Sequence, residues 1–129
     1  MFTQNYETRF SDTDALGHIN NTMVPIWFEG ARDPIFRFFT PDLNVSDWKL
    51  ILAKIDVEFH AQMFYPQPIQ IRTWISHIGN SSFNVYHELW QDNEKRASGN
   101  AVMVHFCHQQ KKAKPIPDNI RDQMADHVL

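Results

Sequence analysis

Four runs of strand-forming residues, joined by short turn sequences, fill most of the second half of the chain and constrain its fold more than any other feature. They cover residues 51–63, 69–78, 82–91 and 96–108. In the first run apolar and polar residues alternate with a period of two, as in a strand with one buried face. The segments Gly79-Asn80-Ser81 and Asp92-Asn93-Glu94 are typical turns. Because short turns reverse the chain, neighbouring strands are predicted to be antiparallel.

One long helix is predicted before these strands, over residues 22–32. Its apolar and small residues recur at helical spacing and share one face: Met23, Ile26, Trp27, Gly30 and Ala31. Pro25 has no N–H group and is tolerated only in a first turn. The helix is therefore expected to begin near Asn21 or Thr22, both good capping residues.

Shorter elements complete the pattern. A short first strand is predicted over 6–10, and the sequence Asp33-Pro34 predicts a second helix start with a shorter helix over 34–39. Residues 40–48 read as a loop, and a weakly apolar helix is expected over 118–127. One long helix and one antiparallel sheet of five strands give a two-layered α+β fold in the order β-α-β-β-β-β.

Composition limits the class of protein. The 129 residues fit a single domain, 1–129, and 43% hydrophobic against 21% charged residues is a globular balance. A net charge of -3 argues against a nucleic-acid partner, and Cys107 is the only cysteine, so no disulfide forms within the chain. Neither a signal peptide nor a membrane-spanning apolar run is recognisable. We therefore expect a soluble cytoplasmic protein with no membrane partner.

Polar side chains crowd the segment 9–21, just before the long helix. It contains Asp12, Asp14, Gly17, His18, Asn20 and Asn21. A carboxylate can act as a general base or attack as a nucleophile, and free N–H groups at a helix start suit a developing oxyanion. Aspartates are equally frequent as turn residues. The residues alone therefore leave both interpretations of this segment open.

Two longer patterns resemble the hotdog-fold acyl-CoA thioesterases, and most closely their 4-hydroxybenzoyl-CoA thioesterase-like branch. The first is Ser11-Asp12-Thr13-Asp14-x-x-Gly17-His18-x-Asn20-Asn21 followed by Trp27-Phe28-Glu29-x-Ala31-Arg32, and the second is Ile78-Gly79-x-Ser81-Ser82-Phe83. The resemblance implies a hotdog fold, with the sheet wrapped around the helix. It also implies hydrolysis of a fatty or aromatic acyl-CoA without a metal or redox cofactor. Members of this family are dimers or tetramers with active sites between subunits.

The resemblance also assigns roles to the loop. Asp14 would be the catalytic carboxylate, acting as base or nucleophile, and the backbone N–H of Asn21 would polarise the thioester carbonyl. His18 is a candidate for proton transfer, with a loop-stabilising hydrogen bond as the alternative. Gly17 and Asn20 are expected to shape the loop.

Polar residues elsewhere are candidates for binding the CoA part of the substrate, and for each lysine a solvated surface charge is an equally good interpretation. They are Ser81, Ser82, Arg72, Lys111 and Lys112. No metal site is expected, because the seven histidines show no HExxH spacing and one cysteine cannot form a thiolate site. His87 and His105 are interpreted as a structural pair facing each other across strands.

Two other functions remain open from the sequence. A hotdog dehydratase or isomerase acting on an acyl thioester would pair a histidine with an acid across the subunit interface. A non-catalytic module would bind acyl-CoA without releasing the thiol. Thiol release distinguishes both from a thioesterase.

Overall fold

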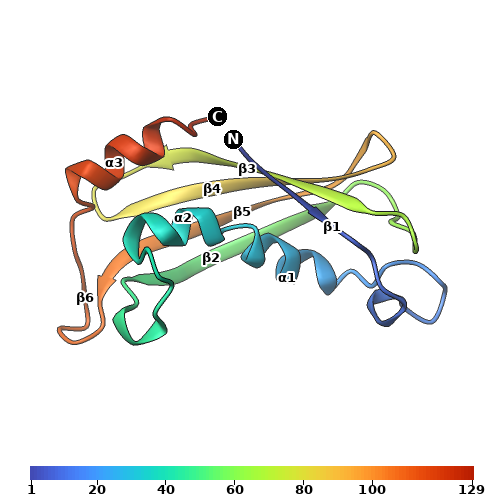
Figure 1. Ribbon diagram of the computed structural model, residues 1–129, viewed down its shortest axis with the longest axis horizontal. Coiled ribbons are helices and arrows are strands. Elements are labelled where there is room, and N and C mark those ends of the chain that lie inside the picture. Colours follow the sequence, from blue (N-terminus) through green and yellow to red (C-terminus); the bar gives the residue numbers. More distant parts are fainter.

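The computed structural model describes all residues, 1–129, and shows a long curved antiparallel sheet with helices packed along one face (Figure 1). The sheet order is β1-β3-β4-β5-β2, with a two-residue strand, β6, added beside β5. The strands are β1 Phe2–Tyr6, β2 Leu50–Phe59, β3 Ile69–Ile78, β4 Ser82–Gln91, β5 Glu94–Cys107 and β6 Lys112–Ala113. Every pairing is antiparallel, as the tight turns predict.

The helices follow the predicted order. They are α1 Met23–Gly30, α2 Asp33–Phe39 and α3 Asp118–Ala125. Pro25 lies in the first turn of α1 and Pro34 in the first turn of α2, where a missing N–H leaves no helical hydrogen bond unmade. Asp33 was expected to cap α2, but it is the first helical residue and Arg32 precedes it. None of the three helices has the length and apolar character that crossing a bilayer requires.

The first strand does not cover 6–10 as predicted; β1 begins at Phe2 and ends at Tyr6. Residues Phe10–Asp12 form a short 3-10 turn instead, held by a hydrogen bond of 2.8 Å from the Arg9 N–H to Asp12 Oδ2. An aspartate that binds the backbone three residues earlier removes that N–H from any strand pairing. The polar segment therefore begins earlier than expected.

Strand β2 also differs from the prediction, because it ends at Phe59 and does not continue to residue 63. The N–H groups of His60 and Ala61 both donate to the Arg96 carbonyl, at 2.8 and 3.1 Å, which ends the regular ladder. Arg96 Nη1 then donates to the Gln62 carbonyl at 2.6 Å. The buried arginine thus turns the chain away from the sheet and towards the polar loop.

The core consists of two apolar clusters along the same face of the sheet. One joins α1 to the β3, β4 and β5 ends nearest the polar loop, and the other joins α2 and α3 to the opposite ends. Gly99 on β5 allows α1 to approach closely: a Cβ there would lie 3.0 Å from a ring carbon of Phe28. The helix start is therefore fixed against the sheet.

Strand β2 lies at one edge of the sheet and pairs only with β5. Its large apolar side chains remain substantially exposed: Ile51 43%, Leu52 41%, Ile55 46% and Phe59 53%. A ten-residue strand with an unpaired edge and exposed apolar side chains is a ready template for pairing with another chain.

Candidate active site

The polar loop between β1 and α1 is held in place on both sides. Ile19 N–H donates to the Met63 carbonyl at 2.9 Å, and Asn20 N–H donates to the Asp12 carbonyl at 2.8 Å. Two isolated bridges, Thr13 with Ile19 and His18 with Phe64, extend this pairing. The loop therefore has a defined shape although it contains little regular structure.

Asp14 uses one carboxylate oxygen to build this loop and leaves the other free. Its Oδ1 accepts hydrogen bonds from the N–H groups of Leu16, at 2.8 Å, and His18, at 3.1 Å. Its Oδ2 has no hydrogen-bond partner within the chain. The turn role and the chemical role are therefore compatible, because they use different oxygens of the same half-buried carboxylate.

The start of α1 presents an unpaired backbone donor beside this carboxylate. Asn20 Oδ1 accepts from the N–H and hydroxyl of Thr22, at 3.1 and 3.0 Å, and Asn20 O accepts from Met23 N–H at 3.0 Å. The Asn21 N–H, by contrast, donates to no group in the chain. A free N–H at the positive end of a helix dipole is suited to bind an oxyanion.

Asp14 and Asn21 line the same cavity, of about 470 Å³. Its other walls come from Ile19 of the polar loop, from the end of β2 and from the segment that follows β2. These residues are Ile19, Phe59, His60, Ala61, Gln62 and Met63. The structure therefore brings Asp14 and Asn21 together around one cavity, with a wall of both apolar and polar side chains.

Three further loop residues lie close by but do not line this cavity. The His18 ring makes no hydrogen bond and packs edge-on against Phe64, with 5.5 Å between ring centroids. Gly17 has a φ of 82°, a conformation that glycine adopts at little cost. Asn20 orders the helix start through Thr22, as described above.

The candidate CoA-binding residues do not gather around Asp14 within one chain. On β5, Ala97 pairs with Phe59 beside the cavity, whereas Val104 pairs with Ser82. Seven strand residues separate these levels, about 23 Å along the sheet. Ser81, Ser82, Lys111 and Lys112 lie at that far end, which is also where β6 pairs with β5.

Arg72 lies neither at the Asp14 cavity nor at the far end of the sheet. It lies on β3, paired with Glu88 of β4, and its guanidinium stacks over the Trp90 ring at 4.2 Å from the centroid. Its Nε also donates to Gln70 Oε1 at 2.8 Å. Arg72 therefore belongs to a small polar hollow separate from the Asp14 cavity.

Sequence reasoning missed His60 as a residue of this cavity. The strict alternation of residues 51–63 assigned it to the polar face of a continuing strand, but the strand ends one residue earlier. His60 Nε2 lies 2.9 Å from Ser98 Oγ. No spacing in the sequence signals this, because the chain is turned by Arg96, which is distant in sequence.

His87 and His105 do not face each other, so their interpretation as a pair is wrong. Buried His87 places Nδ1 2.9 Å from Thr73 Oγ1 and Nε2 3.3 Å from Arg32 Nη1, whereas His105 Nδ1 lies near the Pro115 carbonyl. Burial, and then the Arg32 charge, lower the pKa of His87 from 6.5 to about 3. His87 is therefore a neutral part of the core.

No group of three or more histidine, cysteine, aspartate or glutamate side chains is arranged to hold a metal ion.

Comparisons with known proteins agree with this geometry. A family model described as the Thioesterase-like superfamily matches residues 8–124. A solved structure, described as a predicted thioesterase from Bacillus stearothermophilus, is 41% identical and has a TM-score of 0.97, covering 99% of this chain and 96% of that one. The uncharacterized protein YsmA of Bacillus subtilis (strain 168) is 26% identical over 95% of this chain and 84% of its own length.

A thioesterase from Thermus thermophilus, solved in complex with coenzyme A and Zn, shares the fold. It is 24% identical and has a TM-score of 0.84, with 95% of each chain covered. Together these similarities confirm the expected α+β hotdog fold, with its antiparallel sheet wrapped around a central helix.

Proposed function

Because this chain belongs to the Thioesterase-like superfamily and is a thioester hydrolase, we propose that it hydrolyses acyl-CoA to a free acid and CoA, using Asp14 and the Asn21 N–H. One observation carries the assignment: Asp14 and Asn21 line one cavity, and Asp14 Oδ2 and the Asn21 N–H are both free of partners within the chain. Coenzyme A bound to the Thermus thermophilus thioesterase supports the choice of thioester.

The proposed reaction proceeds through a tetrahedral intermediate. Asp14 Oδ2 takes a proton from water as the water oxygen bonds to the thioester carbon, and the carbonyl oxygen becomes an oxyanion held by the Asn21 N–H. When the C–S bond breaks, the electron pair leaves with sulfur, and the CoA thiolate takes the proton from Asp14. Asp14 could instead attack the carbon directly, with water then hydrolysing the mixed anhydride.

All these steps use groups of the chain and water, so we propose that no metal or redox cofactor takes part. Enzyme dialysed against EDTA is expected to retain its full rate of thiol release. A loss of activity that a divalent metal restores would contradict this part of the proposal.

We also propose that the active form is a homodimer or a larger assembly formed through the free edge of β2. If two β2 strands pair antiparallel, the Leu50 end of one lies beside the Phe59 end of the other. The far end of the sheet in a second copy, with Ser81, Ser82, Lys111 and Lys112, then lies at the level of the Asp14 cavity. This arrangement would supply the CoA contacts that one chain lacks.

The aspartate is tested by Asp14→Asn with a panel of acyl-CoA substrates in a thiol-release assay. An asparagine Oδ1 still accepts from Leu16 and His18, so the loop is preserved while the basic oxygen is lost. We expect kcat to fall by about 100-fold or more, in line with the loss of a general base.

Asp42→Asn is the matched control, because Asp42 Oδ1 also accepts a backbone bond, from Asn44 N–H at 3.0 Å, on an exposed loop. That variant should keep wild-type turnover. Near wild-type turnover in Asp14→Asn would refute the role of Asp14. Tight acyl-CoA binding without thiol release would favour a binding module, and a new C=C absorbance without thiol would favour a dehydratase.

A further inference from the structure

Arg32, at the junction of α1 and α2, is a buried cation that forms no ion pair, although the Glu29 carboxylate is near enough to act on its charge. The residue is 4% exposed, and the only hydrogen-bond partner of its guanidinium is His87. Nε is buried and unpaired, Nη2 has no partner, and no carboxylate lies within 4.0 Å of the guanidinium. Buried charges in proteins are normally paired, because an uncompensated one is unfavourable. The unpaired donors of Arg32 therefore need an explanation.

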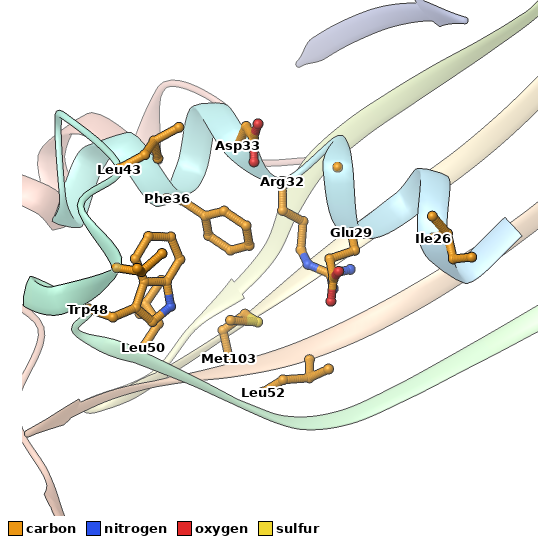
Figure 2. A pocket seen from close by; sticks show the side chains of 12 residues that line it. Ile26, Glu29, Arg32, Asp33, Phe36, Leu43, Trp48, Leu50, Leu52 and Met103 are labelled. Atoms are coloured by element: carbon orange, nitrogen blue, oxygen red, sulfur yellow. The ribbon is translucent and has the colours of Figure 1, made fainter. Parts of the chain in front are cut away.

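Arg32 lines a largely apolar groove of about 610 Å³ between the helices and the edge of β2 (Figure 2). Its apolar walls include Ile26, Phe36, Trp48, Leu50, Leu52 and Met103. Figure 2 shows the side chains of Arg32 and Glu29 both directed from the helices towards the strands. Glu29 likewise makes no side-chain hydrogen bond or ion pair. One donor and one acceptor thus lie unused on the same wall.

This groove continues the line of the Asp14 cavity. Asn21 and Phe59 line the Asp14 cavity. Further along α1, Phe28 and the half-exposed Ile55 line a hollow of only about 10 Å³, which a bound chain would have to widen by displacing the Ile55 side chain. Beyond it, Glu29 and Leu52 line the groove. Residue numbers rise along α1 and fall along β2, so the three spaces follow one seam between the helix and the edge strand.

The length of this seam sets a scale for a bound chain. The His87 ring that contacts Arg32 is stacked on Phe28 at 4.7 Å, so the guanidinium lies at the level of Phe28. Seven helical residues separate Asn21 from that level, about 10 Å along the axis. An extended chain advances roughly 1.2 Å per bond, as a polypeptide does, so this distance corresponds to about eight bonds.

We propose that the acyl group is a medium-length aliphatic chain with a hydroxyl about eight bonds from the thioester carbon, bound between Arg32 and Glu29; this rests on the proposed function. A hydroxyl both accepts and donates, so it satisfies the arginine and the glutamate together. A carboxylate would be repelled by Glu29 and Asp33, and a plain alkyl chain would leave both groups unpaired. A single aromatic ring attached to the carbonyl ends before reaching Arg32.

The test compares octanoyl-CoA with hydroxyoctanoyl-CoA that carries the hydroxyl on its terminal carbon. We expect kcat/KM to be about tenfold or more higher for the hydroxylated chain, because sites with buried hydrogen-bonding groups discriminate against analogues that lack the matching group. In Glu29→Ala the ratio should fall towards one. Asp122→Ala, an exposed acid on α3, is the control and should keep the wild-type ratio. Because Glu29 is exposed, its replacement avoids the folding risk of replacing Arg32.

Equal kcat/KM values for the two chains, both hydrolysed, would overturn this inference and leave the proposed function intact. An unchanged ratio in Glu29→Ala would also overturn it. Calorimetry that compares the binding affinities of free octanoate and its terminal hydroxy derivative tests the groove assignment independently of hydrolysis. Tighter binding of the hydroxy acid without any thiol release would support the groove assignment and refute the thioesterase mechanism, whereas equal binding would refute the groove assignment.

Discussion

The loop uses only one oxygen of the Asp14 carboxylate, because Oδ1 accepts two backbone hydrogen bonds while Oδ2 has no partner in the chain, and the residue lines the cavity. The two interpretations that the sequence left open for this residue are therefore not exclusive. His18 illustrates the opposite case, since its backbone N–H supports Asp14 while its ring turns to Phe64. The type of a single residue indicates what chemistry its side chain can perform. The orientation of that side chain in the fold decides which of its atoms are available for it.

The buried His87 predicts a pH dependence of stability. Its pKa is lowered to about 3 in the folded chain, first by burial and then by Arg32, whereas an unfolded imidazole titrates near 6.5. The unfolded state therefore binds more protons between these values. The stabilisation is complete above about pH 6.5 and is lost as the pH falls, by up to about 1.4 kcal/mol per pH unit.

This dependence is measured by urea unfolding between about pH 7 and about pH 5, above the range in which most carboxylates titrate. His87→Gln removes the titrating ring and keeps an acceptor for Arg32. Its free energy of unfolding should vary less with pH than that of the wild type. If the free energy of unfolding changed with pH by the same amount in both proteins, His87 would not be the source of the pH dependence.

Among the elements, β2 and α1 both approach β5 so closely at Gly99 that a side chain there has no room. A Cβ at this position would lie 2.6 Å from the Asp56 carbonyl oxygen and 3.0 Å from Phe28. Gly99→Ala is expected to lower the free energy of unfolding by about 1–3 kcal/mol, as overpacking does. Chemical denaturation measures this loss.

Gly30→Ala provides the comparison, since its Cβ would meet only the movable Tyr6 hydroxyl at 3.3 Å, and alanine favours a helix. Its loss of stability should be smaller than that of Gly99→Ala. The reverse order would mean that α1 can shift away from β5.

The elements also show what periodicity predicts well. The strands 69–78 and 82–91 were predicted to their ends, because both are rich in strand-forming residues and are bounded by turn residues. The boundaries failed for two different reasons: Asp12 binds the backbone three residues earlier and displaces the first strand, whereas Arg96, distant in sequence, ends β2 early. The Arg96 contact depends on the folded backbone and leaves no local pattern.

For the whole molecule, the edge of β2 predicts self-association. Ile51→Glu places a charge on the exposed edge strand, at a residue that lines none of the three spaces of the seam, and should shift the protein to a smaller assembly in analytical ultracentrifugation. If a second copy completes the CoA site, thiol release should fall in parallel. Val128→Glu, an exposed apolar position beside β3 near the other edge of the sheet, is the control and should change neither. A fully active monomeric Ile51→Glu would contradict both statements.

The site was predictable from the sequence only in part. Asp14 and Asn21 are neighbours along the chain and carry a recognisable pattern, so they could be named together. The link between Arg32 and His87 joins residues 55 positions apart, and the cavity position of His60 depends on Arg96. A single sequence contains no signal for such distant contacts.

The register shift in β2 between Leu52 and Lys54 changes which alternate residues of the strand face the helices. Before it, the even positions Leu50 and Leu52 face the helices; after it, the odd positions Ile55 and Phe59 do. Deleting Ala53 would cancel that change and turn Lys54 or the leucines to the wrong face. The extra residue in this strand thus determines which alternate side chains face the helices. An insertion or deletion there would change which residues line the seam without substituting any of them.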